Sequence, residues 1–166
     1  MRTTSLRPAV PLMLAVVLAL APWLARARGY DLTGVGGSLG YATPQDLDGT
    51  AALGVHAVLE QNGTRLHLDP NMHYWNVDGI RDVTPNMDVT YHFGAERRPT
   101  PYVGGGLGVH FLHDRRSDRD ESDLGVNAIA GLRFPTSAGR CFLEGRFTAS
   151  DVNQVAVATG ITFSTR

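Results

Sequence analysis

LGVHAVLEQNGTRLHLDPNM, residues 53–72, predicts an antiparallel β-hairpin with two unlike faces. Apolar and polar residues alternate along both halves of the stretch, which is the period of a half-buried strand. Asn62-Gly63 sits between the halves and is the strongest short-range signal for a two-residue type I′ turn, because both central positions need positive φ. We therefore expect two paired strands joined by this turn.

The predicted turn also sets the register of the hairpin. Leu59 would lie opposite Leu66 on one face, and Glu60 would lie opposite Arg65 on the other, where opposite charges stabilise the pair. A slip of one residue would exchange the two faces. The hairpin thus has one apolar side and one mostly polar side, and the architecture depends on which of them meets water.

The first residues have the order of a secretory signal peptide. Arg2 and Arg7 precede an apolar run at residues 9–24, and a small-residue cleavage site follows, ending at residue 27. The run contains two prolines and falls short of the ~20 apolar residues that a membrane-spanning helix needs. We expect a cleaved signal at residues 1–27 and one domain at 28–166.

Composition excludes several classes of protein. All 15 basic residues are arginine, and three of them fall in the predicted signal, so 16 acidic residues leave the mature chain mildly acidic. A chain with this balance has no basic surface for a nucleic-acid backbone. Cys141 is the only cysteine, so no internal disulfide can form.

Strand periodicity continues through the rest of the chain. Alternating patterns predict eight strands at residues 30–41, 53–61, 64–75, 83–93, 103–111, 123–134, 141–149 and 154–163. Short connections join them, and the charged stretch at residues 113–122 is expected to be a solvated loop. Pro70 and Pro85 cannot donate in a ladder, so we expect a bulge or local opening at each.

A run of antiparallel strands with no helix to cover an edge is best satisfied by closing into a barrel. A soluble lipocalin-like barrel would have its polar face outside, whereas an outer-membrane barrel would have its apolar face outside. The polar face is rich in small residues, such as Gly104, Gly106 and Ala156, which fit the narrow interior of an eight-stranded barrel. The pattern favours the membrane barrel.

Aromatic residues on the apolar face are predicted to form two rings. The membrane-interface aromatics are Tyr91, Phe93, Phe134 and Phe163 at the periplasmic end and Tyr41, Tyr74, Phe111 and Phe147 at the opposite end. Two belts separated by aliphatic residues are typical of a lipid-facing wall.

Two segments also resemble a known family. PYVGGGLGVHF at residues 101–111 and DLGVNAIAGLRF at residues 123–134 are similar to the glycine-rich paired strands of small outer-membrane β-barrel proteins of the outer membrane protein A transmembrane-domain type. The resemblance implies a closed, all-β, eight-stranded, antiparallel up-and-down transmembrane barrel. It also implies insertion by the barrel-insertion machinery.

The predicted interior carries the charged residues. The lumen charge network is expected to be Glu60, Arg65, His67, Asp69, Asp88, His92, Arg133, Glu144 and Arg146. Charges in so narrow a lumen must pair, so Glu60 with Arg65 and Glu144 with Arg146 are the expected partners. The two interpretations are a polar plug that fills the lumen and a gated pore.

No catalytic or metal chemistry is predicted. Five histidines share the inward parity, but no ligand spacing matches a zinc signature, so we expect no metal and no cofactor. Some outer-membrane barrels modify lipid A through a His-x-Ser pair, whereas the nearest candidate here is His110-Phe111-Leu112, which lacks a serine. We do not expect an enzyme.

The sequence therefore predicts an exported, monomeric outer-membrane barrel with a structural or narrow pore-forming role. Its expected partners are outer-membrane lipid, lipopolysaccharide and the insertion machinery. The alternative is a secreted or periplasmic lipocalin-like barrel that binds an apolar small ligand.

Overall fold

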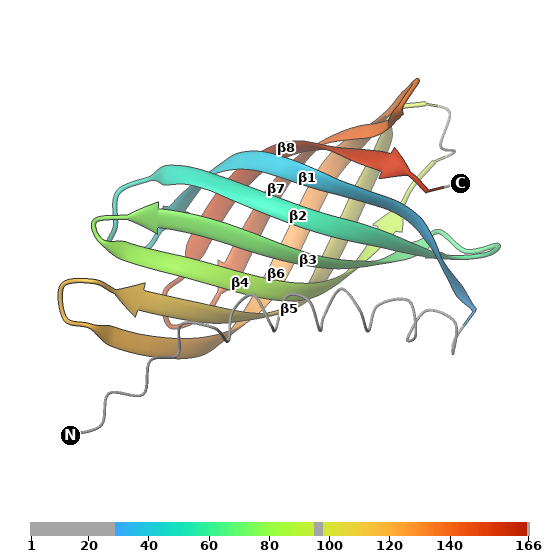
Figure 1. The fold of residues 1–166 in the computed structure, drawn as a ribbon. Helices are drawn as coiled ribbons and strands as arrows, with labels where there is room; N and C mark the ends of the chain where they lie inside the picture. The colour runs from blue at the N-terminus through green and yellow to red at the C-terminus, as the bar shows by residue number, and fades with distance from the viewer. Residues whose placement is uncertain (1–28, 95–97, 166) are drawn as a thin grey trace.

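The computed structural model describes residues 29–94 and 98–165, which form a closed β-barrel (Figure 1). The strands are β1 (Tyr30–Pro44), β2 (Thr50–Gln61), β3 (Leu66–Val77), β4 (Ile80–His92), β5 (Thr100–Asp114), β6 (Arg119–Thr136), β7 (Gly139–Ala149) and β8 (Gln154–Ser164). Each strand pairs antiparallel with its neighbours in chain order, and β1 closes the barrel against β8. The predicted eight-stranded up-and-down barrel is confirmed.

The predicted signal peptide, residues 1–27, lies outside the described residues. In the part of the chain that the structure describes, no helix has the length and apolar character to cross a membrane.

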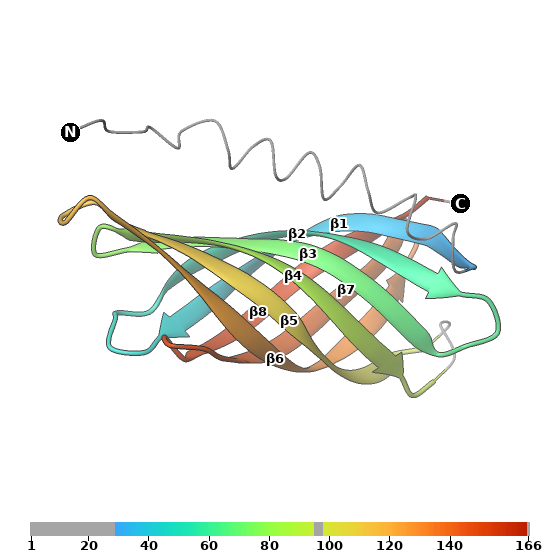
Figure 2. The same cartoon turned by 90° about the horizontal axis from the view of Figure 1, so that it is seen from below.

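The barrel has two distinct ends. The start of β1 and the end of β8 lie at one end, which we call the terminal end (Figures 1 and 2). The β2–β3, β4–β5 and β6–β7 connections are at this same end. The other four connections form the opposite end, which we call the loop end.

The hairpin of β2 and β3 forms with a register two residues away from the prediction. Leu59 pairs with Leu68, and Glu60 pairs with His67. The connection between the two strands holds four residues, 62–65. Within it, the Thr64 N–H and Oγ1 donate to the Gln61 carbonyl at 3.1 and 3.0 Å. Gly63 has a φ of +79°, but Asn62 is not among the described residues with positive φ, so the type I′ turn is wrong. A shift of two preserves parity, and both faces keep their predicted residues.

Both prolines interrupt a ladder, as predicted. Pairing of β2 with β3 stops at His56–Asn71 and resumes at Leu59–Leu68, which leaves Pro70 unpaired on that side. Pairing of β4 with β5 likewise stops at Val83–Phe111 and resumes at Asn86–Gly108, across Pro85. The register does not change at either gap, so each is a local opening rather than a bulge.

Small residues on the inner face make room for larger ones. A Cβ added to Gly106 would collide with the Met87 carbonyl oxygen and would lie 2.7 Å from Asp88 Cα. Because these are backbone atoms of the neighbouring strand, they cannot move aside to accommodate a side chain at this position. The glycines of β5 thus allow the side chains of β4 to occupy the lumen.

The outer surface is apolar over most of the barrel. Leu39 and Leu124 are each 60% exposed, and Leu107 and Val126 are each 54% exposed. Ala57 and Leu59 share the outward parity but are only 4% and 2% exposed. We expected the whole outer face of β2 to be exposed, and at these two residues it is not.

An apolar cluster fills the barrel at the loop end. Trp75, only 2% exposed, packs with Ala42 and Ala156. Leu47, Val77, Ile80 and Leu112 pack around this group, which we call the Trp75 cluster. The polar part of the lumen lies between it and the terminal end.

Candidate functional site: the polar lumen

Inward-pointing residues of every strand meet in the lumen. The members of the predicted set that lie there, buried or half-buried, are Glu60, His67, Asp69, Asp88, His92, Arg133, Glu144 and Arg146. Arg65 lies in the exposed β2–β3 connection, so its predicted pairing with Glu60 across the hairpin is wrong. Glu60 binds Arg140 instead, with Nη1 2.8 Å from Oε1.

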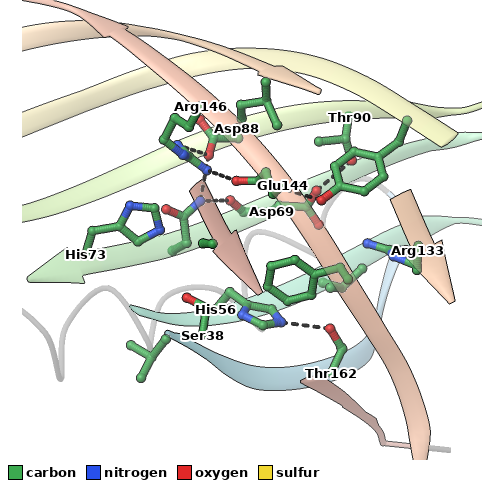
Figure 3. Close-up of a pocket in the computed structure, with 17 residues that line it drawn as sticks. Ser38, His56, Asp69, His73, Asp88, Thr90, Arg133, Glu144, Arg146 and Thr162 are labelled. Carbon is green, nitrogen blue, oxygen red and sulfur yellow. Dashed lines mark hydrogen bonds and ion pairs between the residues drawn. The ribbon is translucent and has the colours of Figure 1, made fainter. Parts of the chain in front are cut away.

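One arginine bridges opposite walls at the centre of the lumen (Figure 3). Arg146 Nη1 on β7 lies 2.8 Å from Asp88 Oδ2 on β4, and Nη2 donates to Glu144 Oε1 at 3.1 Å. Tyr102 Oη donates to the other Glu144 oxygen at 2.9 Å. The side chains of Arg146 and Asp88 are 7% and 1% exposed, so both partners of this ion pair are buried.

Amide side chains hold the Asp88 carboxylate in place. Asn71 Nδ2 donates to Oδ2 at 2.7 Å, and Asn127 Nδ2 donates to Oδ1 at 3.0 Å. Asn127 is itself fixed by Thr148, whose Oγ1 donates to its Oδ1 at 2.9 Å. These donors fix the position of the Asp88 carboxylate, which in turn positions Arg146.

A second cluster lies nearer the terminal end. Arg133 Nη1 lies 3.2 Å from His67 Nδ1, and the His67 and His92 rings stack with centroids 4.0 Å apart. Tyr102 stacks on the other face of this pair, 5.0 Å from the His92 centroid. Tyr102 therefore connects the histidine stack to Glu144 of the central bridge.

A third polar group lies next to the Trp75 cluster, on the side that faces the terminal end. His110 Nδ1 is 2.7 Å from Asp82 Oδ2, and Thr84 Oγ1 donates to the same oxygen at 2.6 Å. The arrangement of acid, histidine and hydroxyl resembles a hydrolytic triad, but Thr84 lies on the Nδ1 side, 3.0 Å from that nitrogen. The nucleophile of a triad must face the other ring nitrogen. Nε2 of His110 is buried and has no hydrogen-bond partner among the described residues.

Small cavities remain between these groups. The central cavity of about 50 Å³ lies beside the Arg146 bridge (Figure 3), with His56, His73 and Arg133 in its wall. The terminal cavity of about 100 Å³ opens at the terminal end and is lined by Arg65, Arg98, Arg133, Arg140, Glu60 and His67, among others. Each has room for a few water molecules or one small ion.

The inward histidines do not form a metal site. His56 contacts Thr162 Oγ1 at 2.8 Å, whereas His110 is paired with Asp82 nearer the loop end. Among residues 29–94 and 98–165, no group of three or more His, Cys, Asp or Glu side chains converges as metal ligands.

Sequence reasoning missed three lumen residues that carry important contacts. Arg140 was assigned to a turn, Asp82 to a loop, and Tyr102 was left out of the inward set. Extending the alternation by one residue at the start of each of these strands would have found them, since all three have inward parity.

The predicted aromatic residues all lie on the outer face. Phe93, Phe163, Phe147 and Tyr41 are 53%, 50%, 47% and 58% exposed. Tyr91 and Phe93 pack edge to face near the terminal end, with centroids 5.1 Å apart. Near the loop end, Tyr74 and Phe111 flank Val83 on adjacent strands.

The fold is similar to that of solved outer-membrane barrels. The crystal structure of Neisserial surface protein A (NspA) superposes with a TM-score of 0.65 at 12% identity, covering 81% of this chain and 96% of that chain. The N-terminal barrel domain of Pseudomonas aeruginosa OprF has a TM-score of 0.54 at 17% identity, covering 78% and 97%. The outer membrane enzyme PagL also has a TM-score of 0.54 at 17% identity, covering 76% and 98%. No protein-family model and no curated protein sequence matches the chain.

Proposed function

We propose that this chain is a monomeric outer-membrane barrel with a closed, structural lumen. The apolar outer surface supports a lipid environment: a water-soluble barrel rarely exposes contiguous apolar area on this scale. The solved barrels that share its fold are outer-membrane proteins, which agrees with this placement. Its partners would be outer-membrane lipid and lipopolysaccharide at the surface, and the insertion machinery during assembly.

The aromatic residues support the same placement. Tyr91, Phe93, Phe134 and Phe163 lie toward the terminal end of their strands, and Tyr41, Tyr74, Phe111 and Phe147 lie toward the loop end. Aliphatic outward residues such as Leu107 and Val126 lie between the two groups. This is the arrangement that two membrane interfaces favour.

The observation that carries the closed-lumen proposal is the bridge from Arg146 to Asp88 and Glu144. It joins β7 to β4 across the barrel, so an ion would have to break buried ion pairs to pass. The Trp75 cluster closes the loop end independently. Both features favour a plug over the gated pore that the sequence left open.

A ligand-binding barrel of the lipocalin type is poorly supported. Such a protein needs an apolar pocket, commonly of ~300 Å³ or more. The largest of the cavities described above is about 100 Å³ and is lined mainly by charged and polar groups. The apolar residues that would line a lipocalin pocket are outside.

Cell fractionation tests the membrane placement. We expect the expressed protein in the outer-membrane fraction, with faster gel migration before boiling than after it, because a closed barrel resists detergent until heated. An outer-membrane protein of known behaviour from the same gel serves as the control. Recovery in the soluble fraction without detergent would contradict the proposal.

Planar-bilayer recording tests the closed lumen. We expect no discrete conductance steps from the wild type or from Glu144→Ala, because the Trp75 cluster still closes the loop end of the variant. A larger barrel with an open lumen, inserted in the same bilayer, verifies that steps can be detected. Reproducible steps from the folded wild type would show a pore.

A further inference from the structure

We propose that the terminal cavity binds a small, multiply charged oxyanion of the phosphate class. Four arginines line this cavity: Arg65 and Arg98 from connections at the terminal end, Arg133 from β6 and Arg140 from β7. Among the described residues that line it, Glu60 is the one carboxylate. The inference concerns binding at the mouth of the barrel and goes beyond the structural role proposed above.

Among the described residues that line the terminal cavity, positive charges outnumber negative ones. Arg140 forms an ion pair with Glu60 at 2.8 Å. Arg65, Arg98 and Arg133 form no ion pair with any carboxylate in the described part of the chain. The cavity therefore holds an excess of positive charge in a confined space, where water screens it poorly.

Arg133 lines the terminal cavity from inside the barrel and has no ion pair with a carboxylate among the described residues. Its Nε is buried and has no hydrogen-bond partner among the described residues. Its Nη1 faces His67 Nδ1 at 3.2 Å, a neutral acceptor that cannot compensate the charge. An arginine placed in this way is costly to bury, and an anion between it and the other guanidinium groups would supply the missing acceptors.

The geometry selects the class of anion. Guanidinium groups donate paired hydrogen bonds that match the oxygens of phosphate or carboxylate. Several unneutralised arginines favour a multiply charged phosphate over a singly charged carboxylate or halide. A cavity of about 100 Å³ holds the phosphate group itself but no sugar or acyl chain attached to it.

Isothermal titration of the refolded barrel with inorganic phosphate, at low ionic strength, tests the proposal. We expect saturable binding by the wild type and a loss of about tenfold or more in affinity for Arg133→Gln, since a charge-assisted hydrogen bond is worth at least that factor. Arg65→Gln, in an exposed connection that should leave folding intact, is expected to weaken binding by a smaller factor. Heat-modifiable gel migration verifies that each variant is folded.

Arg81→Gln is the matched control, because Arg81 is an exposed arginine at the loop end and loses the same charge. We expect it to bind phosphate as the wild type does. Absence of saturable binding, equal weakening by Arg81→Gln, or equally strong binding of acetate would each overturn the proposal. Because binding is measured on the folded barrel, failure here is distinct from a failure of the closed-lumen proposal, which conductance reports.

A second arm identifies the source of the phosphate group. The same titration is repeated with the barrel in vesicles of phosphatidylcholine alone and in vesicles that also contain phosphatidic acid. If the site takes a lipid headgroup, phosphatidic acid will weaken the apparent affinity for inorganic phosphate in the wild type. If it takes a free anion, the two vesicle types will give the same affinity. Either result agrees with an oxyanion site.

Discussion

Replacing Arg146 by methionine is expected to lower the free energy of unfolding of the barrel by about 3 to 5 kcal/mol, the typical cost of breaking a buried ion pair from one side. The substitution leaves the Asp88 and Glu144 carboxylates without their cation. Asp88 is 1% exposed, so water cannot easily replace the lost partner. Equilibrium unfolding in guanidinium chloride, with lipid vesicles present, measures the change.

Two further variants make this result specific. Arg81→Met removes an exposed arginine from β4 and is expected to change the unfolding free energy by less than about 0.5 kcal/mol. The triple variant Asp88→Asn, Glu144→Gln, Arg146→Met removes all three charges and should recover much of the loss. If Arg146→Met were as mild as Arg81→Met, the central bridge would not hold the lumen together.

Replacing Leu107 by arginine is expected to destabilise the barrel by about 2 to 4 kcal/mol, because a charged residue at the bilayer midplane loses its hydration. Leu107 is 54% exposed on the outer face and lies between Met87 and Val126, midway between the two aromatic groups. On the surface of a water-soluble barrel the same change would be nearly neutral. The unfolding measurement described above, in vesicles, reports the difference.

Leu66→Arg is the matched control for depth. Leu66 is also an outward leucine, 41% exposed, but it begins β3 at the terminal end and pairs with Tyr91 of the aromatic group there. Near an interface an arginine costs only about 0 to 1 kcal/mol. Equal effects at Leu66 and Leu107 would contradict a lipid-facing wall with a hydrophobic midplane.

The alternation of residues was enough to predict the strands, their antiparallel order and their two faces. It worked because each strand has one polar and one apolar side, so parity alone separates lumen from outer wall. The predicted register of β2 with β3 was wrong because the connection holds four residues rather than two: β2 ends at Gln61 and β3 begins at Leu66. A shift of two leaves parity intact, which is why Glu60 still points inward although Arg65 does not reach it.

The partners within the lumen could not be read from the sequence in the same way. Arg140 and Glu60 are 80 residues apart, and closure of the barrel alone brings them together. The pairing of Arg146 with Asp88 depends similarly on the diameter of the barrel and on the glycines of β5. By contrast, Glu144 and Arg146 are two residues apart on one strand, and their predicted contact is present.

In one charged segment the sequence predicted too little strand. Residues 113–122 were expected to form a solvated loop, but β5 extends to Asp114 and β6 begins at Arg119. His113 pairs with Asp120 across the hairpin, and their side chains meet at 2.7 Å. Cross-strand polar contacts of this kind, and the pairing of Asp114 with Arg119, sustain a ladder where no apolar face exists to mark it.

Under the closed-lumen proposal, the Trp75 cluster makes the barrel a cup that is open only at the terminal end. Water and ions inside it exchange with only one of the two solutions that bathe the molecule, the one at the terminal end. With the terminal end on the periplasmic side, as the sequence predicts, that solution is the periplasm, so the arginines of the terminal cavity meet periplasmic ions. A quencher or salt added outside the cell would reach them only by first crossing to the other side.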